Sequence, residues 1–396
     1  MESTQCNLLN RRQFLAAAGG AAGVAACRLC RGSETEPHAR ILETKVISRQ
    51  SQYYHGWPTL TRRRNGQILL VYSGGREEHV CPFGRVELMV STDNGHTWSW
   101  PRVLLDSAID DRDAGVIETS RGDILVTTFT SLAYEKALQA AAIQKPGAAG
   151  SWQAERLMAW QSAHNRLTAE QRRAELGQWM IRSTDGGLSW SARYHSIVNS
   201  PHGPIQLSDG RLLYAGKELW TGQQRVGVCE SLDHGETWHW LADIRPRPND
   251  TVQNYHELHA VEAADGRVIT HIRNHNQANS GETLQTESTD GGRTWSVPHA
   301  IGVWGLPSFL LRLQNGSLLM TYGHRRSPLG NQGRLSLDNG RAWSEPMIIS
   351  GDGTSIDLGY PSTAQLEDGA LLTVWYELMR GSSRAVLRQA RWMIDA

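Results

Sequence analysis

Turn residues and short apolar runs alternate along this chain and divide it into six similar parts. At six places a turn glycine follows Asn, Asp or Arg and precedes an apolar, strand-like run. These places are Asn65–Leu70, Arg121–Leu125, Asp209–Leu213, Asp265–Ile269, Asn315–Leu319 and Asp368–Leu372. A glycine that supplies a positive φ between two apolar runs is typical of a β-hairpin. The pattern therefore predicts six hairpins.

A second repeat follows five of these hairpins. It has the form Ser-x-Asp-x-Gly-x-x-Trp and occurs at Ser91–Trp98, Ser183–Trp190, Ser231–Trp238, Ser288–Trp295 and Ser336–Trp343. The Asp side chain can accept hydrogen bonds from the backbone of its own turn, and the Trp can bury a large apolar surface beneath it. Five copies in one chain indicate a repeat architecture.

The spacing of the turn glycines gives the size of the repeating unit. Successive glycines lie 56, 88, 56, 50 and 53 residues apart. A unit of about fifty residues holds four strands of ordinary length with their turns. We therefore predict an all-β fold, a six-bladed β-propeller that spans residues 41–396 as one domain.

The single long spacing places an insertion in the second blade. Residues 133–177 are rich in Ala, Gln, Glu, Arg and Leu, which favour helices. Thr168–Gln171 has the pattern of a capping box. We expect a helical insertion here, above the same face as the functional loops. Ile41–Ser48 alternates like a strand, and we expect it to complete the last blade and remove the free edge of the ring.

The first thirty residues predict an export signal. Arg11 and Arg12 precede a short apolar run, as in a twin-arginine (Tat) signal peptide. Val24–Cys27 resembles a lipoprotein processing site, so Cys27 is a candidate for a lipid anchor. We expect residues 31–40 to form a tether. The predicted location is the periplasm, the cell envelope or the extracellular medium.

Propeller topology brings reactive side chains to one face of the ring. Residues that enter the first strand of a blade lie beside residues that leave the second strand, opposite the glycine turn. Counting nine residues back from each turn glycine gives six equivalent positions near the axis. They are Trp57, Asp113, Pro201, Glu257, Pro307 and Tyr360. Several loops that converge on one axis predict a binding pocket.

Histidines are frequent on this predicted face. They are His55, His79, His202, His256, His275 and His324. Imidazole can serve as a general base or a metal ligand near neutral pH. These residues show no tight metal-ligand spacing, so we predict neither a metal site nor a cofactor. The formal net charge is zero, which gives no indication of a nucleic-acid partner.

With these features the chain resembles the sialidase (neuraminidase) superfamily, whose Asp boxes match the five Ser-x-Asp-x-Gly-x-x-Trp repeats. The resemblance covers residues 41–396. It implies that Tyr360, at the start of the sixth blade, is the nucleophile and that Glu257 activates it. It also implies an arginine clamp for the substrate carboxylate, to which Arg273 and either Arg325 or Arg326 correspond.

The chain departs from the family pattern at two places. The first clamp arginine is replaced by Gly56, and Arg112 or Arg76 could substitute for it. The loop that carries the family's acid/base Asp contains no Asp here, and the remaining candidates are Glu77, Glu78, His79 and Asp113. Further candidates for substrate binding are His55, Trp57, His202 and His256.

These residues predict an exo-glycosidase that releases a terminal acidic sugar from a glycan and retains the anomeric configuration. A phenol is a poor nucleophile unless a carboxylate takes its proton, and a neutral Tyr is not repelled by an anionic sugar. Two alternatives remain open. One is a polysaccharide lyase that acts on uronate-containing glycans, and the other is a propeller that binds carbohydrate without catalysis.

Overall fold

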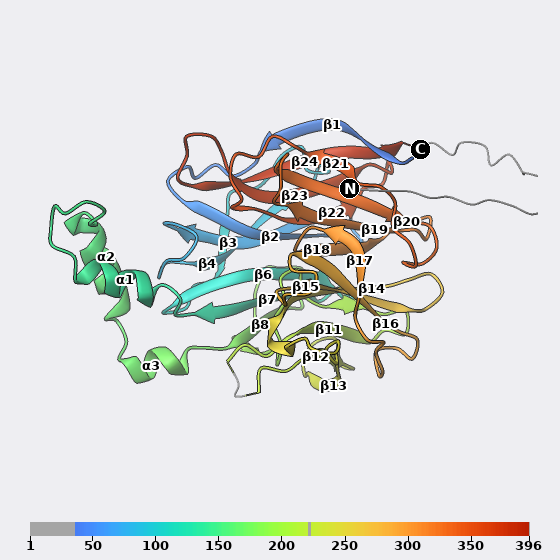
Figure 1. Ribbon diagram of the computed structural model, residues 1–396, viewed down its shortest axis with the longest axis horizontal. Helices are drawn as coiled ribbons and strands as arrows, with labels where there is room; N and C mark the ends of the chain where they lie inside the picture. The colour runs from blue at the N-terminus through green and yellow to red at the C-terminus, as the bar shows by residue number, and fades with distance from the viewer. Residues whose placement is uncertain (1–35, 221–222, 396) are drawn as a thin grey trace, which may run out of the picture. The chain divides into compact units, whose positions relative to one another are not determined.

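The computed structural model describes residues 36–220 and 223–395, which form six four-stranded antiparallel sheets (Figure 1). Strands that follow one another in the sequence pair within each sheet. The first strands of successive sheets lie against each other around most of the ring, and in the third sheet the second strand makes the contact with the fourth sheet. This arrangement confirms the predicted all-β, six-bladed propeller. The expected export signal, the lipidation candidate Cys27 and most of the expected tether lie outside the described residues.

The first three blades begin at β2 and end at β13. Blade one contains β2 (Tyr54–Arg62), β3 (Ile68–Arg76), β4 (Arg85–Ser91) and β5 (Arg102–Leu105). Blade two contains β6 (Asp110–Glu118), β7 (Ile124–Ser131), β8 (Gln178–Ser183) and β9 (Tyr194–His195). Blade three contains β10 (Ile205–Gln206), β11 (Leu212–Lys217), β12 (Val226–Ser231) and β13 (His239–Asp243).

The last three blades complete the ring, and a short 3-10 helix, η1 (Val252–Asn254), precedes the fourth. Blade four contains β14 (Tyr255–Glu262), β15 (Val268–Asn274), β16 (Glu282–Ser288) and β17 (His299–Trp304). Blade five contains β18 (Ser308–Arg312), β19 (Leu318–His324), β20 (Gly330–Ser336) and β21 (Met347–Ser350). Blade six contains β22 (Leu358–Gln365), β23 (Leu371–Leu378), β24 (Ala385–Asp395) and β1 (His38–Val46).

Blade six combines the two ends of the described chain. β1 pairs antiparallel with β24, from His38 opposite Asp395 to Val46 opposite Arg388. β1 begins at His38, so residues 38–40, which the sequence assigned to a tether, are part of the sheet. The pairing gives β24 a partner along its outer side, where it would otherwise expose unpaired backbone groups.

Three helices lie between β7 and β8. They are α1 (Glu135–Ala142), α2 (Ala154–His164) and α3 (Ala169–Ala174). Figure 1 shows them together on the left, beyond the ends of the strands. The predicted capping box is present at α3, because the Gln171 N–H donates to Thr168 Oγ1 at 3.2 Å and the Thr168 N–H donates to Gln171 Oε1 at 2.8 Å. Among the described residues, the helices are all too short and too polar to cross a bilayer.

The Asp boxes stabilise the outer turns and contribute to the contacts between blades. In one of them, Asp290 Oδ1 accepts hydrogen bonds from Ser288 Oγ and from the Thr294 N–H, both at 2.8 Å. Trp98 and Trp238 are buried, and the other three Asp-box tryptophans are half-buried against the core. Trp98 of blade one donates to Gln389 of blade six at 2.8 Å. These turns are structural and lie away from the axis.

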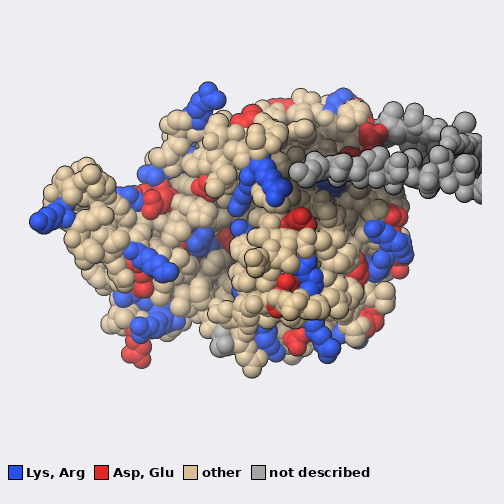
Figure 2. Space-filling model, in the orientation of Figure 1, with Lys and Arg blue, Asp and Glu red and all other residues tan. Residues whose placement is uncertain are grey.

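The surface of the described residues carries both signs of charge. In Figure 2, basic and acidic side chains are interspersed over the face shown. This mixture agrees with the equal numbers of basic and acidic residues in the sequence, 40 of each.

Candidate functional site

Four blades present one residue each to the axis through the same local distortion of their first strand. In blade one, Gly56 pairs with Ser73 and Thr59 with Val71, so the first strand advances three residues while its partner advances two. Blades two, four and six repeat this β-bulge. The bulge residues are Trp57, Asp113, Glu257 and Tyr360, all with a φ between 44° and 53°. A positive φ is unfavourable for such side chains and occurs mainly where a site requires it.

The four bulge residues line one cavity of about 270 Å³ at the axis. Its full lining is Trp57, His79, Arg112, Asp113, Phe129, Glu257, Arg273, Arg325, Tyr360 and Tyr376. These side chains come from blades one, two, four, five and six. The structure therefore brings together eight of the residues singled out in the sequence, and adds Phe129 and Tyr376.

Tyr360 and Glu257 form a hydrogen-bonded pair with Arg273. The Tyr360 hydroxyl donates to Glu257 Oε1 at 2.5 Å, and Arg273 Nη1 donates to Glu257 Oε2 at 2.5 Å. The same guanidinium nitrogen lies 3.1 Å from Tyr360 Oη. Tyr360 is only 5% exposed. The geometry thus places a carboxylate within proton-transfer distance of a buried phenol.

Electrostatics fixes the protonation of this pair. Burial and the neighbouring Glu257 carboxylate raise the pKa of Tyr360 well above 10, against the opposing effect of Arg273. Burial alone would raise the pKa of Glu257, but the Arg273 charge and the hydrogen bond from Tyr360 hold that pKa below its usual value. At neutral pH the pair is therefore a neutral phenol and an ionised carboxylate.

Three arginines from three blades line the cavity. Arg273 belongs to β15, Arg325 follows β19, and Arg112 precedes the bulge of β6. Arg325 donates to the Leu358 carbonyl oxygen at 2.9 and 3.1 Å. Arg112 lies 4.5 Å from the centre of the Trp57 ring, and within the described part of the chain its Nε has no hydrogen-bond partner. Arginines in such an arrangement can bind a carboxylate.

Asp113 occupies the cavity beside these charges and is only 7% exposed. Its Oδ1 has no hydrogen-bond partner among the described residues. Burial, with the repulsion of Glu257, raises the pKa of Asp113 to about 7, although Arg112 opposes the change. A carboxyl group of this kind can donate a hydrogen bond or exchange a proton near neutral pH.

His79 also lines the cavity and is held by a second carboxylate. Its Nδ1 lies 2.9 Å from Asp357 Oδ1. Tyr54 donates to Asp357 Oδ2 at 2.9 Å, and Tyr376 donates to Asp357 Oδ1 at 3.0 Å. Burial would raise the pKa of Asp357, but the contacts with His79, Tyr54 and Tyr376 lower it below its usual value. Asp357 is therefore an ionised acceptor for three neighbours.

Seven predicted site residues lie outside this lining, and one of them, Glu77, pairs with Arg156 of α2 at 2.5 Å. Arg76 is fully buried and pairs with Asp110 at 2.6 Å, which occupies it in the core rather than in a substrate clamp. Glu78 pairs with Arg156 of α2 at 2.9 Å. The Arg326 guanidinium lies 3.8 Å from the centre of the Trp304 ring. The remaining three are histidines.

The three histidines differ in burial and partners. His55 is buried, and its Nδ1 lies 3.3 Å from the Ala385 carbonyl oxygen. His202 is also buried, and burial lowers its pKa to about 3. It lines a separate cavity near the hairpin side of the ring, together with His259. His256 packs against His275 with ring centres 4.6 Å apart, and burial lowers its pKa to about 4.

Phe129 and Tyr376 were not among the candidate residues identified from the sequence. Both lie within the second strand of a blade, where apolar and aromatic residues ordinarily belong to the core. Phe129 pairs with Arg112 across the hairpin, and Tyr376 pairs with Gly359. No sequence signal marks them, because each lies near the axis through its pairing beside a bulge, which only the structure shows.

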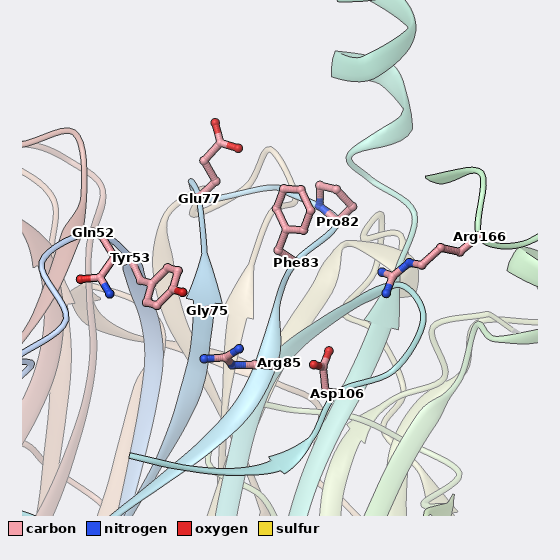
Figure 3. Close-up of a pocket in the computed structure, with 9 residues that line it drawn as sticks. All are labelled: Gln52, Tyr53, Gly75, Glu77, Pro82, Phe83, Arg85, Asp106 and Arg166. Atoms are coloured by element: carbon pink, nitrogen blue, oxygen red, sulfur yellow. The ribbon is translucent and has the colours of Figure 1, made fainter. Parts of the chain in front are cut away.

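A larger cavity of about 400 Å³ lies on the other side of the loop between β3 and β4 (Figure 3). It is lined mainly by blade one, with Arg166 contributed by the segment that joins α2 to α3. Glu77, Pro82 and Phe83 of the loop face this cavity, whereas His79 of the same loop lines the axial one. The loop therefore separates the two hollows. Within the described residues, no group of three or more His, Cys, Asp or Glu side chains is arranged to hold a metal ion.

Comparison with known proteins agrees with this architecture. Residues 120–373 match the family described as "BNR repeat-like domain". A protein of Paraclostridium sordellii named sialidase is 24% identical over 291 residues, which are 66% of this chain and 62% of that protein. The chain thus spans less than two thirds of the length of this relative.

Two solved structures illustrate the likeness in fold. A Dyadobacter fermentans protein of unknown function has a TM-score of 0.71 at 21% identity, with 90% of this chain and 99% of that chain covered. The NanB sialidase of Streptococcus pneumoniae has a TM-score of 0.59 at 15% identity, with 90% of this chain and 70% of that chain covered. At these identities the likeness establishes a shared fold.

Proposed function

Since this chain belongs to the BNR-repeat family of the sialidase superfamily, we propose that it is a glycoside hydrolase that releases a terminal acidic sugar and retains the anomeric configuration. The observation that carries the proposal is the hydrogen-bonded set of Tyr360, Glu257 and Arg273 in a cavity lined by two further arginines. The likeness to proteins named sialidase makes a sialoside the first substrate to test.

Tyr360 acts as the nucleophile in this proposal. Glu257 takes the phenolic proton as Tyr360 Oη attacks the anomeric carbon, and Arg273 neutralises the charge on the pair. A neutral phenol approaches an anionic sugar without the repulsion that a carboxylate nucleophile would meet. Tyr nucleophiles are a known exception to the two-carboxylate rule for glycosidases.

In this proposal the sugar carboxylate is bound by Arg112, Arg273 and Arg325. Arg112 supplies from blade two the positive charge that the first blade lacks because Gly56 stands at its clamp position. Its guanidinium is sandwiched between Trp57 and Phe129, at 4.5 and 6.0 Å from the ring centres. This packing orients the group while it leaves the N–H donors available to a substrate.

The test compares the purified protein with its Tyr360→Phe variant on 4-methylumbelliferyl α-sialoside and on a panel of aryl glycosides of uronic acids. We expect the wild-type protein to release the fluorophore and Tyr360→Phe to lose at least about 10³-fold in kcat. Tyr322→Phe is a matched control, because Tyr322 is equally buried but donates to Gln332 away from the cavity. Turnover that survives in Tyr360→Phe would reject the proposal.

The same panel distinguishes the two alternatives. A lyase would convert uronate-containing polysaccharides into unsaturated products that absorb in the ultraviolet. A carbohydrate-binding propeller would retain glycans on a glycan array and release nothing from any substrate. Either result would replace the hydrolase assignment.

A further inference from the structure

Two of the four acid/base candidates lie in positions that do not suit proton transfer to a substrate. Glu77 accepts a hydrogen bond from Trp160 Nε1 at 2.7 Å and forms an ion pair with Arg156 at 2.5 Å. Glu78 pairs with the same arginine. Both carboxylates are therefore bound to α2, outside the axial cavity. His79 and Asp113 remain, because both line the cavity.

His79 and Asp113, the two remaining candidates for the general acid, differ in their exposure to solvent. The leaving group of an exo-acting glycosidase must point towards solvent, since it carries the rest of the glycan. The His79 side chain is 45% exposed, whereas Asp113 is 7% exposed. His79 therefore lies at the mouth of the cavity, where the bond to the leaving group must break. Asp113 lies at the floor, where it can bind the sugar ring.

The contacts of His79 fix its ring orientation. Asp357 accepts from Nδ1 at 2.9 Å, and the ring packs edge-on against Trp57 with centres 4.9 Å apart. Burial and the neighbouring Tyr376 and Asp357 keep the pKa of Tyr54 well above 10, so its hydroxyl stays a donor to Asp357. Nδ1 thus lies 2.9 Å from the carboxylate and 3.0 Å from the Tyr54 hydroxyl oxygen, whereas Nε2 has no hydrogen-bond partner among the described residues. A carboxylate that accepts from one imidazole nitrogen fixes which ring nitrogen faces it and orients the other nitrogen towards the cavity.

The loop that carries His79 is anchored on several sides. Arg76 Nη2 donates to the His79 carbonyl oxygen at 2.9 Å. Arg384 donates to the Glu77 carbonyl oxygen, and α2 holds both glutamates through Arg156. These contacts position the imidazole before substrate binds, which general acid catalysis requires.

We propose that His79 is the general acid and base of this glycosidase and that Asp357 is its positioning residue; the proposal rests on the function proposed above. In the first step Tyr360 Oη bonds to the anomeric carbon as the glycosidic C–O bond breaks. The electron pair stays on the leaving oxygen, which takes the proton of His79 Nε2, while Glu257 takes the phenolic proton.

The second step restores the enzyme. His79 Nε2 takes a proton from water as the water oxygen bonds to the anomeric carbon. The bond to Tyr360 Oη breaks, and the phenolate recovers its proton from Glu257. The net reaction adds one water to the glycoside and releases the acidic sugar and the alcohol.

Leaving-group dependence tests the assignment. The substrates are 3′-sialyllactose, whose sugar leaving group needs a proton, and 4-nitrophenyl α-sialoside, whose leaving group needs little help. We expect His79→Gln and His79→Asn to lose about 10²–10⁴-fold in kcat/KM on sialyllactose and about tenfold or less on the nitrophenyl sialoside. Asp357→Asn should show the same selectivity with a smaller loss. His324→Gln, on the same face but outside the cavity lining, is the control.

Each other outcome overturns the proposal. Equal losses on both substrates, or no loss on either, would remove His79 from proton transfer while the Tyr360 result still supports the hydrolase. A selective loss in Asp113→Asn, without one in the His79 variants, would transfer the role to Asp113. Wild-type silence on both sialosides would reject this assignment for sialosides together with the proposed sialidase-like activity. Thermal unfolding of each variant confirms that it is folded.

Discussion

Asp113 shows how a single residue in a functional cavity can reduce the stability of the fold. Its pKa is about 7 in the folded protein and about 3.9 in an unfolded chain. The folded state therefore binds the proton more tightly, and the stabilising contribution of the neutral carboxyl is complete below about pH 4. It decreases as the pH rises towards 7, because the folded protein must then hold a buried charge.

We expect Asp113→Asn to remove this pH dependence. The free energy of unfolding of the variant, relative to the wild type, should rise between pH 4.5 and 7.5 by at most about 4 kcal/mol and level off above that range. Urea denaturation of both proteins at several pH values measures the difference. A difference that stays constant across the range would mean that Asp113 titrates normally.

For single residues, the sequence predicted which side chains reach the cavity better than it predicted the contacts they make there. The common spacing to the turn glycine selected Tyr360 and Glu257, because each blade repeats the same strand and turn. It left Arg112 and Arg76 as alternatives, since nothing in their sequence context separates them. The structure separates them through Asp110, which binds Arg76 in the core and whose proximity depends on how two blades pack.

Among the elements, β6 carries Asp113 and packs closely against blade three. A Cβ atom at Gly115, two residues after Asp113, would lie 2.4 Å from the Gly203 backbone nitrogen and 2.6 Å from Thr127 Oγ1. Blades two and three can approach this closely only because Gly115 has no side chain. Backbone atoms cannot move aside as a flexible side chain can.

We therefore expect Gly115→Ala to lower the free energy of unfolding by about 1–3 kcal/mol. Gly351→Ala is the control, because the only neighbour of its Cβ within 4 Å is Ile348 Cγ2 at 3.7 Å. Urea midpoints measure both variants. A Gly115→Ala protein as stable as the control would show that blades two and three separate without cost.

The sequence predicted the hairpins well because glycine and Asp–Gly turns carry a strong local signal. It could not predict the bulges, since Trp57, Glu257 and Tyr360 are not types that favour a positive φ, and Asp113, whose type does occur there, gives no distinctive signal alone. Their conformation is imposed by strand pairing and by the ring, which are tertiary effects. The sequence spacing therefore identified these four residues. It did not identify the bulges that turn their side chains towards the axis.

For the whole molecule, the pairing of β1 with β24 joins the two ends of the described chain. Most β1 side chains are exposed, so the backbone hydrogen bonds to β24 carry most of the contribution. We expect replacement of residues 38–46 by nine Gly and Ser residues to weaken this pairing, because Gly is depleted in strands and costs more entropy to order, so that several of these bonds, each worth about 1 kcal/mol, are no longer formed stably. The melting temperature should fall by roughly 2–4 °C for each kcal/mol lost.

The control replaces residues 142–150, nine consecutive exposed residues that begin at the last residue of α1 and end before α2, by the same Gly and Ser segment. This change should leave the melting temperature within about 2 °C. Calorimetry of both variants measures the two melting temperatures. Equal melting temperatures would mean that β24 needs no partner along its outer side.

At the scale of the whole molecule, repetition made the ring predictable, because six similar units leave few alternatives to a propeller. The role of α2 was not predictable in the same way. Its contacts with the loop of His79 run through Arg156 and Trp160, which lie about eighty residues from their partners Glu77 and Glu78 in the sequence. Helix propensity gives no information about such contacts.

The shared bulge also has a consequence for how this chain could diverge. Each of four blades contributes one side chain to the centre through an identical backbone setting, so an exchange at one position leaves the geometry of the other three in place. New specificities can therefore arise blade by blade, through single substitutions, without an intermediate that has lost the ring. Gly56 and Arg112 illustrate this, because each stands just before the bulge residue of its blade, and one blade has no side chain where the next has a guanidinium.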